Sequence, residues 1–133
     1  MKQTILIVDD EPDLVELTGY HLRAAGFKTL TAFDGSEALN QARSHLPDLI
    51  LLDLMLPELD GLSVCELLHR LPSTRQIPII IVSAWKNEQS RLLGLELGAE
   101  DYISKPFSPR ELVLRVQKVL HRRTELVVTH SQV

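Results

Sequence analysis

The sequence predicts a doubly wound α/β fold with a five-stranded parallel sheet, and three observations lead to this prediction. Apolar runs of strand length alternate five times with segments of helical periodicity, at the spacing of βαβ units. Three of these runs are almost continuously apolar, which is typical of strands buried on both faces of a parallel sheet. Acidic residues follow two of the runs, where open α/β sheets bind ligands. A chain of 133 residues is expected to form one such domain.

The expected strands follow one another with a helical segment between each pair. They are residues 4–8, 28–32, 48–52, 77–82 and 101–104. The first, third and fourth are the nearly continuous apolar runs, so we expect them in the middle of the sheet. The chain contains no internal repeat and no low-complexity segment that would indicate a different architecture.

The expected helices are bounded by start and stop signals. Gly26 and Gly98 follow the first and fourth helical segments, and Pro47 follows the second. The clearest start is at residues 108–111, a capping box with proline at the first helical position. The predicted helices are residues 12–25, 36–45, 61–71, 88–97 and 109–122.

Composition excludes several classes of protein. The chain has 14 basic and 18 acidic residues, a net charge of −4, and no basic run suited to a phosphate backbone, so direct nucleic-acid binding is not expected. Cys65 is the single cysteine and cannot form an internal disulfide. The N-terminal apolar run is too short for a signal peptide or membrane span. We therefore expect a cytoplasmic protein without membrane contact, whose partners are proteins or small phosphates.

Acidic residues mark the predicted ligand-binding edge of the sheet. Asp9, Asp10 and Glu11 follow the first strand, and Asp53 follows the third. Like charges in one crevice raise one another's pKa or require a cation, and an all-oxygen site suits Mg²⁺, or Mn²⁺, better than a soft metal. Glu11 is left out of this predicted metal site, because Pro12 is expected to start the helix and place Glu11 at its favourable N-terminal end.

A series of short motifs resembles the receiver domain of bacterial two-component response regulators. The motifs are Asp9-Asp10-Glu11, Asp53 with Met55 and Pro57, Asp60-Gly61, Ser83-Ala84, Gly98-Ala99, Asp101-Tyr102 and Lys105-Pro106-Phe107. The resemblance covers about residues 2–123, and residues 94–113 are most similar to the OmpR/PhoB subfamily. It implies a flavodoxin/CheY-like (βα)5 fold with strand order 2-1-3-4-5. It also implies a self-phosphorylating and self-dephosphorylating switch rather than a turnover enzyme.

The resemblance gives Asp53 the role of phosphoacceptor, with a sensor histidine kinase as donor. Lys105 is the cation that contacts the phosphoryl group, and in this family the bond to Pro106 is cis and directs the lysine inward. Ser83 is the hydroxyl that donates to a phosphoryl oxygen, and the backbone amide of Ala84 lies beside it. The ordinary alternatives are a helix-capping role for Asp53 and a solvent-facing Lys105.

The resemblance also assigns the metal ligands. Asp10 and Asp53 bind Mg²⁺ directly, the backbone carbonyl of Met55 is a third ligand, and Asp9 holds the ion through water. The alternative, a solvated acidic turn before the first helix, suits Glu11 but fits poorly for Asp9, Asp10 and Glu11 together.

Two further expectations concern the switch and its lifetime. Tyr102 is the aromatic that swings inward as Ser83 moves, and its alternative is a half-buried strand tyrosine that does not move. Met55 and Trp85 lie two residues beyond Asp53 and Ser83, where bulky side chains can cover the phosphoryl group. We expect slow self-hydrolysis for this reason, although a tryptophan at a partner-binding site is an equally good interpretation.

The predicted output surface combines the last two helices with the last strand. The fourth helix carries Leu92, Leu93, Leu95 and Leu97, a wider apolar arc than core burial requires, so some of these leucines should be exposed. OmpR/PhoB receivers use the matching face for a two-fold dimer that forms on phosphorylation. Here Leu92, Leu95 and Leu114 fit its apolar patch. Four charged residues fit the surrounding ring of ion pairs: Arg91, Asp101, Glu111 and Arg115. A solvated face with a few tolerated leucines is the alternative.

The domain organisation follows from the same resemblance. Residues 1–123 form the receiver, and residues 124–133 are a tail or the start of a linker to an absent effector domain. Residues 124–128 could begin a strand, but nothing remains for it to pair with. A stand-alone receiver that signals as a monomer is the main rival function. A phosphohydrolase of the haloacid dehalogenase type is the other, and its Asp-x-Asp motif is absent.

Overall fold

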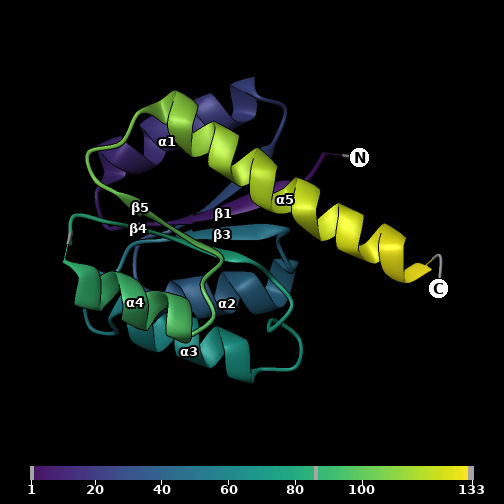
Figure 1. Cartoon of the computed structure of the whole chain (residues 1–133). Coiled ribbons are helices and arrows are strands. Elements are labelled where there is room, and N and C mark those ends of the chain that lie inside the picture. Colours follow the sequence, from purple (N-terminus) through teal and green to yellow (C-terminus); the bar gives the residue numbers. More distant parts are fainter. Residues whose placement is uncertain (1, 86, 132–133) are drawn as a thin grey trace.

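The computed structural model describes residues 2–85 and 87–131, and within them five parallel strands form one sheet with helices on both faces (Figure 1). The strands are β1 (Thr4–Val8), β2 (Lys28–Ala32), β3 (Leu49–Leu52), β4 (Ile79–Ser83) and β5 (Asp101–Ser104). Their order is β2-β1-β3-β4-β5, and each neighbouring pair is parallel. The predicted fold class and strand order are confirmed.

The helices form a layer on each side of the sheet (Figure 1). One layer contains α1 (Pro12–Ala24) and α5 (Pro109–Ser131), and the other contains α2 (Gly35–His45), α3 (Gly61–Arg70) and α4 (Glu88–Glu96). Side chains alternate between these layers along each strand. On β1, Ile5 and Ile7 pack with α1 and α5, whereas Leu6 and Val8 pack with α2 and α3. None of the helices in the described residues is both long and apolar enough to cross a membrane.

Polar side chains fix the starts of four helices by accepting a hydrogen bond from a free backbone N–H group. Asp34 and Asp60 accept from Glu37 and Ser63 at 2.8 and 2.9 Å. Asn87 caps α4 in the same way, at 2.7 Å from the nitrogen of Ser90. Half of the predicted capping box of α5 is present: the Ser108 hydroxyl accepts from the nitrogen of Glu111 at 3.4 Å, whereas the Glu111 carboxylate pairs with Arg115. The predicted start of that helix is confirmed.

Two predicted boundaries are wrong by more than one residue. The fourth strand begins at Ile79 rather than Ile77, because the N–H of Ile77 donates to Thr74 in a turn and Pro78 has no N–H to give to the sheet. The last helix continues to Ser131, so the backbone of residues 124–128 is helical and not extended. Elongating an existing helix costs far less than starting a strand that has no neighbour. The other boundaries differ from the prediction by at most one residue.

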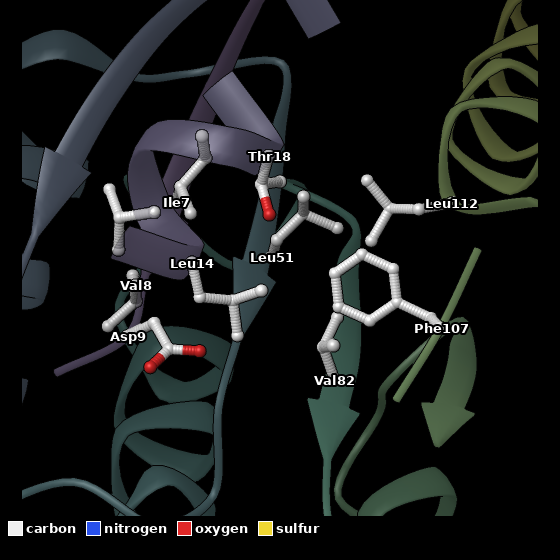
Figure 2. Close-up of a pocket in the computed structure, with 10 residues that line it drawn as sticks. Ile7, Val8, Asp9, Leu14, Thr18, Leu51, Val82, Phe107 and Leu112 are labelled. Atoms are coloured by element: carbon white, nitrogen blue, oxygen red, sulfur yellow. The ribbon is translucent and has the colours of Figure 1, made fainter. Parts of the chain in front are cut away.

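The core beneath the acidic strand ends is closely packed. A cavity of about 10 Å³, with room for about one water molecule, lies there. The hydroxyl of Thr18 is among the groups that line it (Figure 2). Phe107 and Leu112 close one side of this cavity, against Val82 of β4. Phe107 therefore anchors the segment that follows β5 to the core, two residues after Lys105.

Cys65 lies in the core of the α2 and α3 layer and is fully buried. Burial raises the pKa of its thiol to about 11, so the reactive thiolate is scarce at neutral pH. Cys65 is therefore a packed and unreactive residue of the core.

Candidate active site

The two strand-end carboxylates lie side by side because their strands are paired. Val8 and Leu52 are register partners at the ends of β1 and β3, and they are followed directly by Asp9 and Asp53. The N–H of Asp53 continues the sheet by donating to the carbonyl of Val8 at 3.0 Å. Oxygen atoms of four carboxylates lie within 4.8 Å of one another, and these belong to Asp9, Asp10, Glu11 and Asp53. The predicted shared crevice is therefore present.

Lys105 occupies the centre of this carboxylate cluster. Its Nζ atom lies 2.7 Å from Oδ2 of Asp9, 3.0 Å from Oδ2 of Asp53 and 3.4 Å from Oε1 of Glu11. The Lys105 side chain is only 12% exposed, so the interpretation as a solvent-facing lysine is wrong. The N–H of Lys105 donates to the carbonyl of Ser83 at 2.8 Å, and the peptide bond to Pro106 is cis, as the resemblance implies.

Burial and neighbouring charges shift the pKa values of Asp53 and Lys105 in opposite directions. Burial raises the pKa of Asp53, and the hydrogen bonds from Met55 N–H and from Lys105 offset this only in part. Burial alone would lower the pKa of Lys105, but its contacts with Asp9 and Asp53 raise that pKa above its usual value. Lys105 is therefore charged at neutral pH, while the ionised form of Asp53 is held at a cost in free energy.

The donor set fits a hard divalent cation. All of the clustered groups offer carboxylate oxygens, which Mg²⁺ and Mn²⁺ prefer, and none offers the sulfur or imidazole of a softer site. Asp10 and Glu11 are exposed, so an ion has a route to the cluster from solvent.

Glu11 differs from its prediction, which placed it at the start of the first helix and outside the metal site. It takes the N-cap position of α1, as expected, but its side chain makes no capping bond and its carboxylate joins the cluster. The available signal was its adjacency to Asp9 and Asp10 in the sequence.

Gly61 holds the loop after β3 in place. Its N–H donates to the carbonyl of Leu54 at 3.0 Å, and a Cβ atom at this position would overlap the backbone of Asp53 and Leu54. Only glycine permits so close an approach of the start of α3 to the residue that carries the central carboxylate. The Asp60-Gly61 motif thus has two separate structural roles, a helix cap and a close backbone contact.

The two predicted switch residues both hydrogen-bond to the backbone of Trp85, one to its N–H group and the other to its carbonyl. Ser83 is fully buried at the end of β4, and its hydroxyl oxygen accepts a hydrogen bond from the N–H of Trp85 at 3.1 Å. The hydroxyl of Tyr102 donates to the carbonyl of Trp85 at 2.6 Å. Tyr102 is buried rather than half-buried. Ala84, the predicted source of a phosphoryl-binding amide, lies between Ser83 and Trp85 and is exposed.

The predicted output surface has the expected exposed leucines. The side chains of Leu92, Leu95 and Leu114 are 51%, 37% and 56% exposed. The charged ring is partly paired within the chain: Arg115 lies 3.0 Å from Asp101 and 3.1 Å from Glu111. Arg91 is exposed on α4. Contacts between two copies through this ring would therefore compete with ion pairs that already exist.

Comparison with known proteins identifies the family. Residues 5–117 match the family described as response regulator receiver domain. The chain belongs to this family. It is 47% identical over 132 residues to the alkaline phosphatase synthesis transcriptional regulatory protein PhoP of Bacillus subtilis, a match that covers 99% of this chain and 54% of that protein. It is 51% identical over 118 residues to the transcriptional regulatory protein BaeR of Escherichia coli, covering 89% and 48% of the two chains.

Solved structures agree with this assignment. A putative response regulator from Chloroflexus aurantiacus superposes with a TM-score of 0.86 at 39% identity, covering 91% of this chain and 99% of that one. A CheY-like receiver domain protein from Methanospirillum hungatei superposes with a TM-score of 0.88 at 27% identity, covering 94% and 98%. The resemblance to OmpR/PhoB receivers is therefore confirmed, and the haloacid dehalogenase alternative gains no support.

Membership of the receiver family defines the class of activity. The family consists of signalling switches in two-component systems rather than of turnover enzymes, and its members bind Mg²⁺ at an acidic pocket such as the one around Asp53. The chain spans about half the length of the curated relatives that it matches.

Proposed function

We propose that this receiver is activated by phosphorylation of Asp53 by a sensor histidine kinase, in a reaction that requires Mg²⁺. The observation that supports this most strongly is the contact between Asp53 and Lys105 inside a cluster of oxygen ligands. A buried carboxylate with a raised pKa, in reach of a fixed cation and a metal site, is suited to attack phosphorus and to tolerate the charge that develops there.

In the proposed reaction, a carboxylate oxygen of Asp53 attacks the phosphorus atom in line with the leaving nitrogen of the kinase histidine. The new P–O bond forms as the P–N bond breaks, and the electron pair of that bond stays on the imidazole. The Met55 N–H group orients the carboxylate through Oδ1, at 3.1 Å. Lys105 contacts the phosphoryl oxygens and stabilises their negative charge as the bond to Asp53 forms. Asp10, Asp53, the Met55 carbonyl and, through water, Asp9 would hold Mg²⁺, which would supply the remaining positive charge when bound.

The phosphoryl group is then expected to act as a ligand that prefers one of two conformations. Ser83 already accepts a hydrogen bond from Trp85, and its hydroxyl hydrogen is the group that donates to the phosphoryl oxygen. The Ala84 amide is the second donor. Moving the switch from mostly inactive to mostly active takes about 5 kcal/mol of preference, which a few charge-assisted hydrogen bonds supply. Tyr102 follows Ser83 because both hydrogen-bond to the backbone of Trp85, through its carbonyl and its N–H group respectively.

Intact-mass spectrometry tests the phosphoacceptor directly. After incubation with Mg²⁺ and acetyl phosphate, the parent chain should gain one phosphate, and Asp53→Ala should gain none. Asp13→Ala, which removes an exposed acid from α1, serves as the control and should behave as the parent. Phosphate that does not depend on Asp53, or none at all, would mean a degenerate receiver that acts by constitutive binding.

Phosphorylation is further proposed to produce a two-fold dimer through α4, β5 and α5. Leu95→Asp places a charge in the exposed patch formed by Leu92, Leu95 and Leu114, and the phosphorylated variant should remain monomeric in light scattering at concentrations where the parent dimerises. Leu17→Asp is the matched control, because Leu17 is 48% exposed on α1. Dimerisation of Leu95→Asp as in the parent would assign the dimer to another face. A monomeric phosphorylated parent would favour the stand-alone receiver.

Trp85 is proposed to lengthen the life of the phosphoryl group by obstructing water. Both Trp85 and Met55 are exposed, and their backbone N–H groups bond to Ser83 and Asp53, so each side chain begins at the reacting groups. Trp85→Ala should lose phosphate several-fold faster than the parent, measured as the decay of phosphorylated mass after the donor is removed. An unchanged decay would instead favour the interpretation of Trp85 as a partner-binding aromatic.

Residues 1–123 are proposed as the receiver, and residues 124–133 as the start of a linker, of which 132–133 lie outside the described residues. Transcriptional output is proposed because the relatives are named transcriptional regulatory proteins. Any DNA contact would be made by a further domain and not by this segment. The cytoplasm is the compartment that suits the single unpaired Cys65.

A further inference from the structure

A second candidate site lies at the opposite end of the sheet from Asp53. An open groove of about 510 Å³ runs beside the start of β2, between the C-terminal ends of α1 and α2. Its floor includes Phe27 and Leu30, which are buried and partly buried. None of the family motifs contributes to this groove.

The described residues that line the groove include several bases and no acid. The basic residues are Lys2, Arg23, Lys28 and His45. This concentration stands out in a chain whose net charge is −4. Arg23 is held over β2 by a hydrogen bond of 3.0 Å from Nη1 to the hydroxyl of Thr29. The carboxylate of the nearby Asp48 accepts the N–H of Thr4 at 2.7 Å.

Only two of the four basic residues in the groove lie at helix ends, where the helix dipole favours a positive charge. Arg23 lies in the last turn of α1 and His45 ends α2, where cations offset the partial negative charge of a helix C-terminus. Lys2 and Lys28 lie on the strand side of the groove and serve no helix end. Their positive charge is left to interact with a ligand or with solvent.

The strand beneath the groove is an edge of the sheet. β2 pairs only with β1 among the described strands, so its outer backbone N–H and C=O groups have no strand partner. Lys28 and Thr31 are exposed on it, and Thr29 and Leu30 are partly exposed. An edge of this kind is where an extended peptide adds as a further strand, with its main chain supplying hydrogen bonds and its side chains supplying specificity.

We propose that the β2 groove binds an extended acidic peptide of a partner protein, which lies along the outer edge of β2 with its carboxylates against Lys2, Arg23 and Lys28. The open shape of the groove and its continuity with a strand edge favour a peptide over a compact small molecule, which needs an enclosing pocket. Arg23 bonds to Thr29, whereas Lys28 belongs to the opposite face of β2. Neighbouring carboxylates on the two faces of the peptide therefore meet these two bases, and apolar side chains on either side of them meet the floor. This site is separate from the Asp53 site, so it stands or falls independently of the phosphorylation mechanism.

The test uses the full chain and a short capped peptide in which two neighbouring glutamates are flanked by valines. In NMR titrations at low salt, the peptide should shift the backbone amides of residues 2–4 and 28–32, and should protect amides of β2 from hydrogen exchange. Arg23→Glu combined with Lys28→Glu should weaken binding by about tenfold or more. Arg75→Glu, an exposed reversal of the same sign in the loop before β4, should leave the affinity unchanged.

Two further probes distinguish a peptide site from general charge attraction. A peptide with glutamine in place of glutamate should bind weakly, and inorganic tripolyphosphate should shift these amides less than the acidic peptide does. Equal binding of the neutral peptide, equal shifts with tripolyphosphate, or equal weakening by Arg75→Glu would overturn the proposal. Unfolding midpoints of the variants check that the fold is intact, and the milder Arg23→Gln with Lys28→Gln replaces the reversal if it is not.

Discussion

Replacing Lys105 by methionine is expected to lower the free energy of unfolding by about 3 kcal/mol at neutral pH when no divalent cation is present. The variant leaves the buried carboxylates of Asp9 and Asp53 together without the cation that contacts both at 2.7 and 3.0 Å. Methionine keeps most of the volume of the lysine stem, so the loss reports the charge rather than a cavity. Lys118→Met, at an exposed site on α5, should change stability by less than about 0.5 kcal/mol.

The dependence of this effect on pH and Mg²⁺ identifies its cause. Burial raises the pKa of Asp53 in the folded chain, and loss of the Lys105 charge raises it further, because Lys105 lowers it at present. The folded state then binds a proton more readily than the unfolded state, so the stability of Lys105→Met should increase as the pH falls through the folded pKa toward 3.8. Mg²⁺ should restore stability in proportion to its binding. Urea unfolding with and without Mg²⁺ measures both trends, and a loss that responds to neither would have a packing origin.

Substitution of Gly61 by alanine should be nearly as costly. The added Cβ atom meets the carbonyl of Asp53 and the Cα of Leu54, which are backbone atoms that cannot rotate away. We expect a loss of about 3 kcal/mol in the free energy of unfolding, together with slower phosphorylation by acetyl phosphate, because the loop must shift the phosphoacceptor to make room.

Gly19→Ala is the matched control for this experiment. Gly19 lies within α1, and its added Cβ atom meets only the end of the flexible Arg23 side chain. Alanine also favours a helix more than glycine does, so this variant should be as stable as the parent or slightly more stable. If Gly61→Ala matched Gly19→Ala in both stability and phosphorylation rate, the close contact between Gly61 and the backbone of Asp53 would matter neither for folding nor for phosphorylation.

The architecture could be predicted from the sequence because its signals are local and repeated. Each strand is a short apolar run, and each helix has a cap or a terminating glycine that acts within a few residues. Pro78 shows where such signals fail, since its apolar neighbours extend the run while the missing N–H delays the start of β4. The predicted end of α5 was wrong for a different reason. The β-branched residues within 124–128 favour a strand only when a partner strand exists.

The sequence predicts which residues form the site but not which contacts they make with one another. Spacing and strand order place Asp9, Asp53 and Lys105 at one edge, because parallel strands end together. That Lys105 also approaches Glu11, and that Arg115 is already paired with Asp101, depends on side-chain rotamers and on segments far apart in the chain. Such choices follow from packing that no single stretch of sequence contains.

The contacts of Trp85 have one practical consequence. The chain contains a single tryptophan, whose backbone N–H group is bonded to Ser83 and whose backbone carbonyl is bonded to Tyr102. Its indole ring is partly open to water, where emission responds to small changes of surroundings. The molecule thus carries its own optical probe at the junction of the two residues proposed to move, and activation can be followed in real time by intrinsic fluorescence, without a dye or an engineered label.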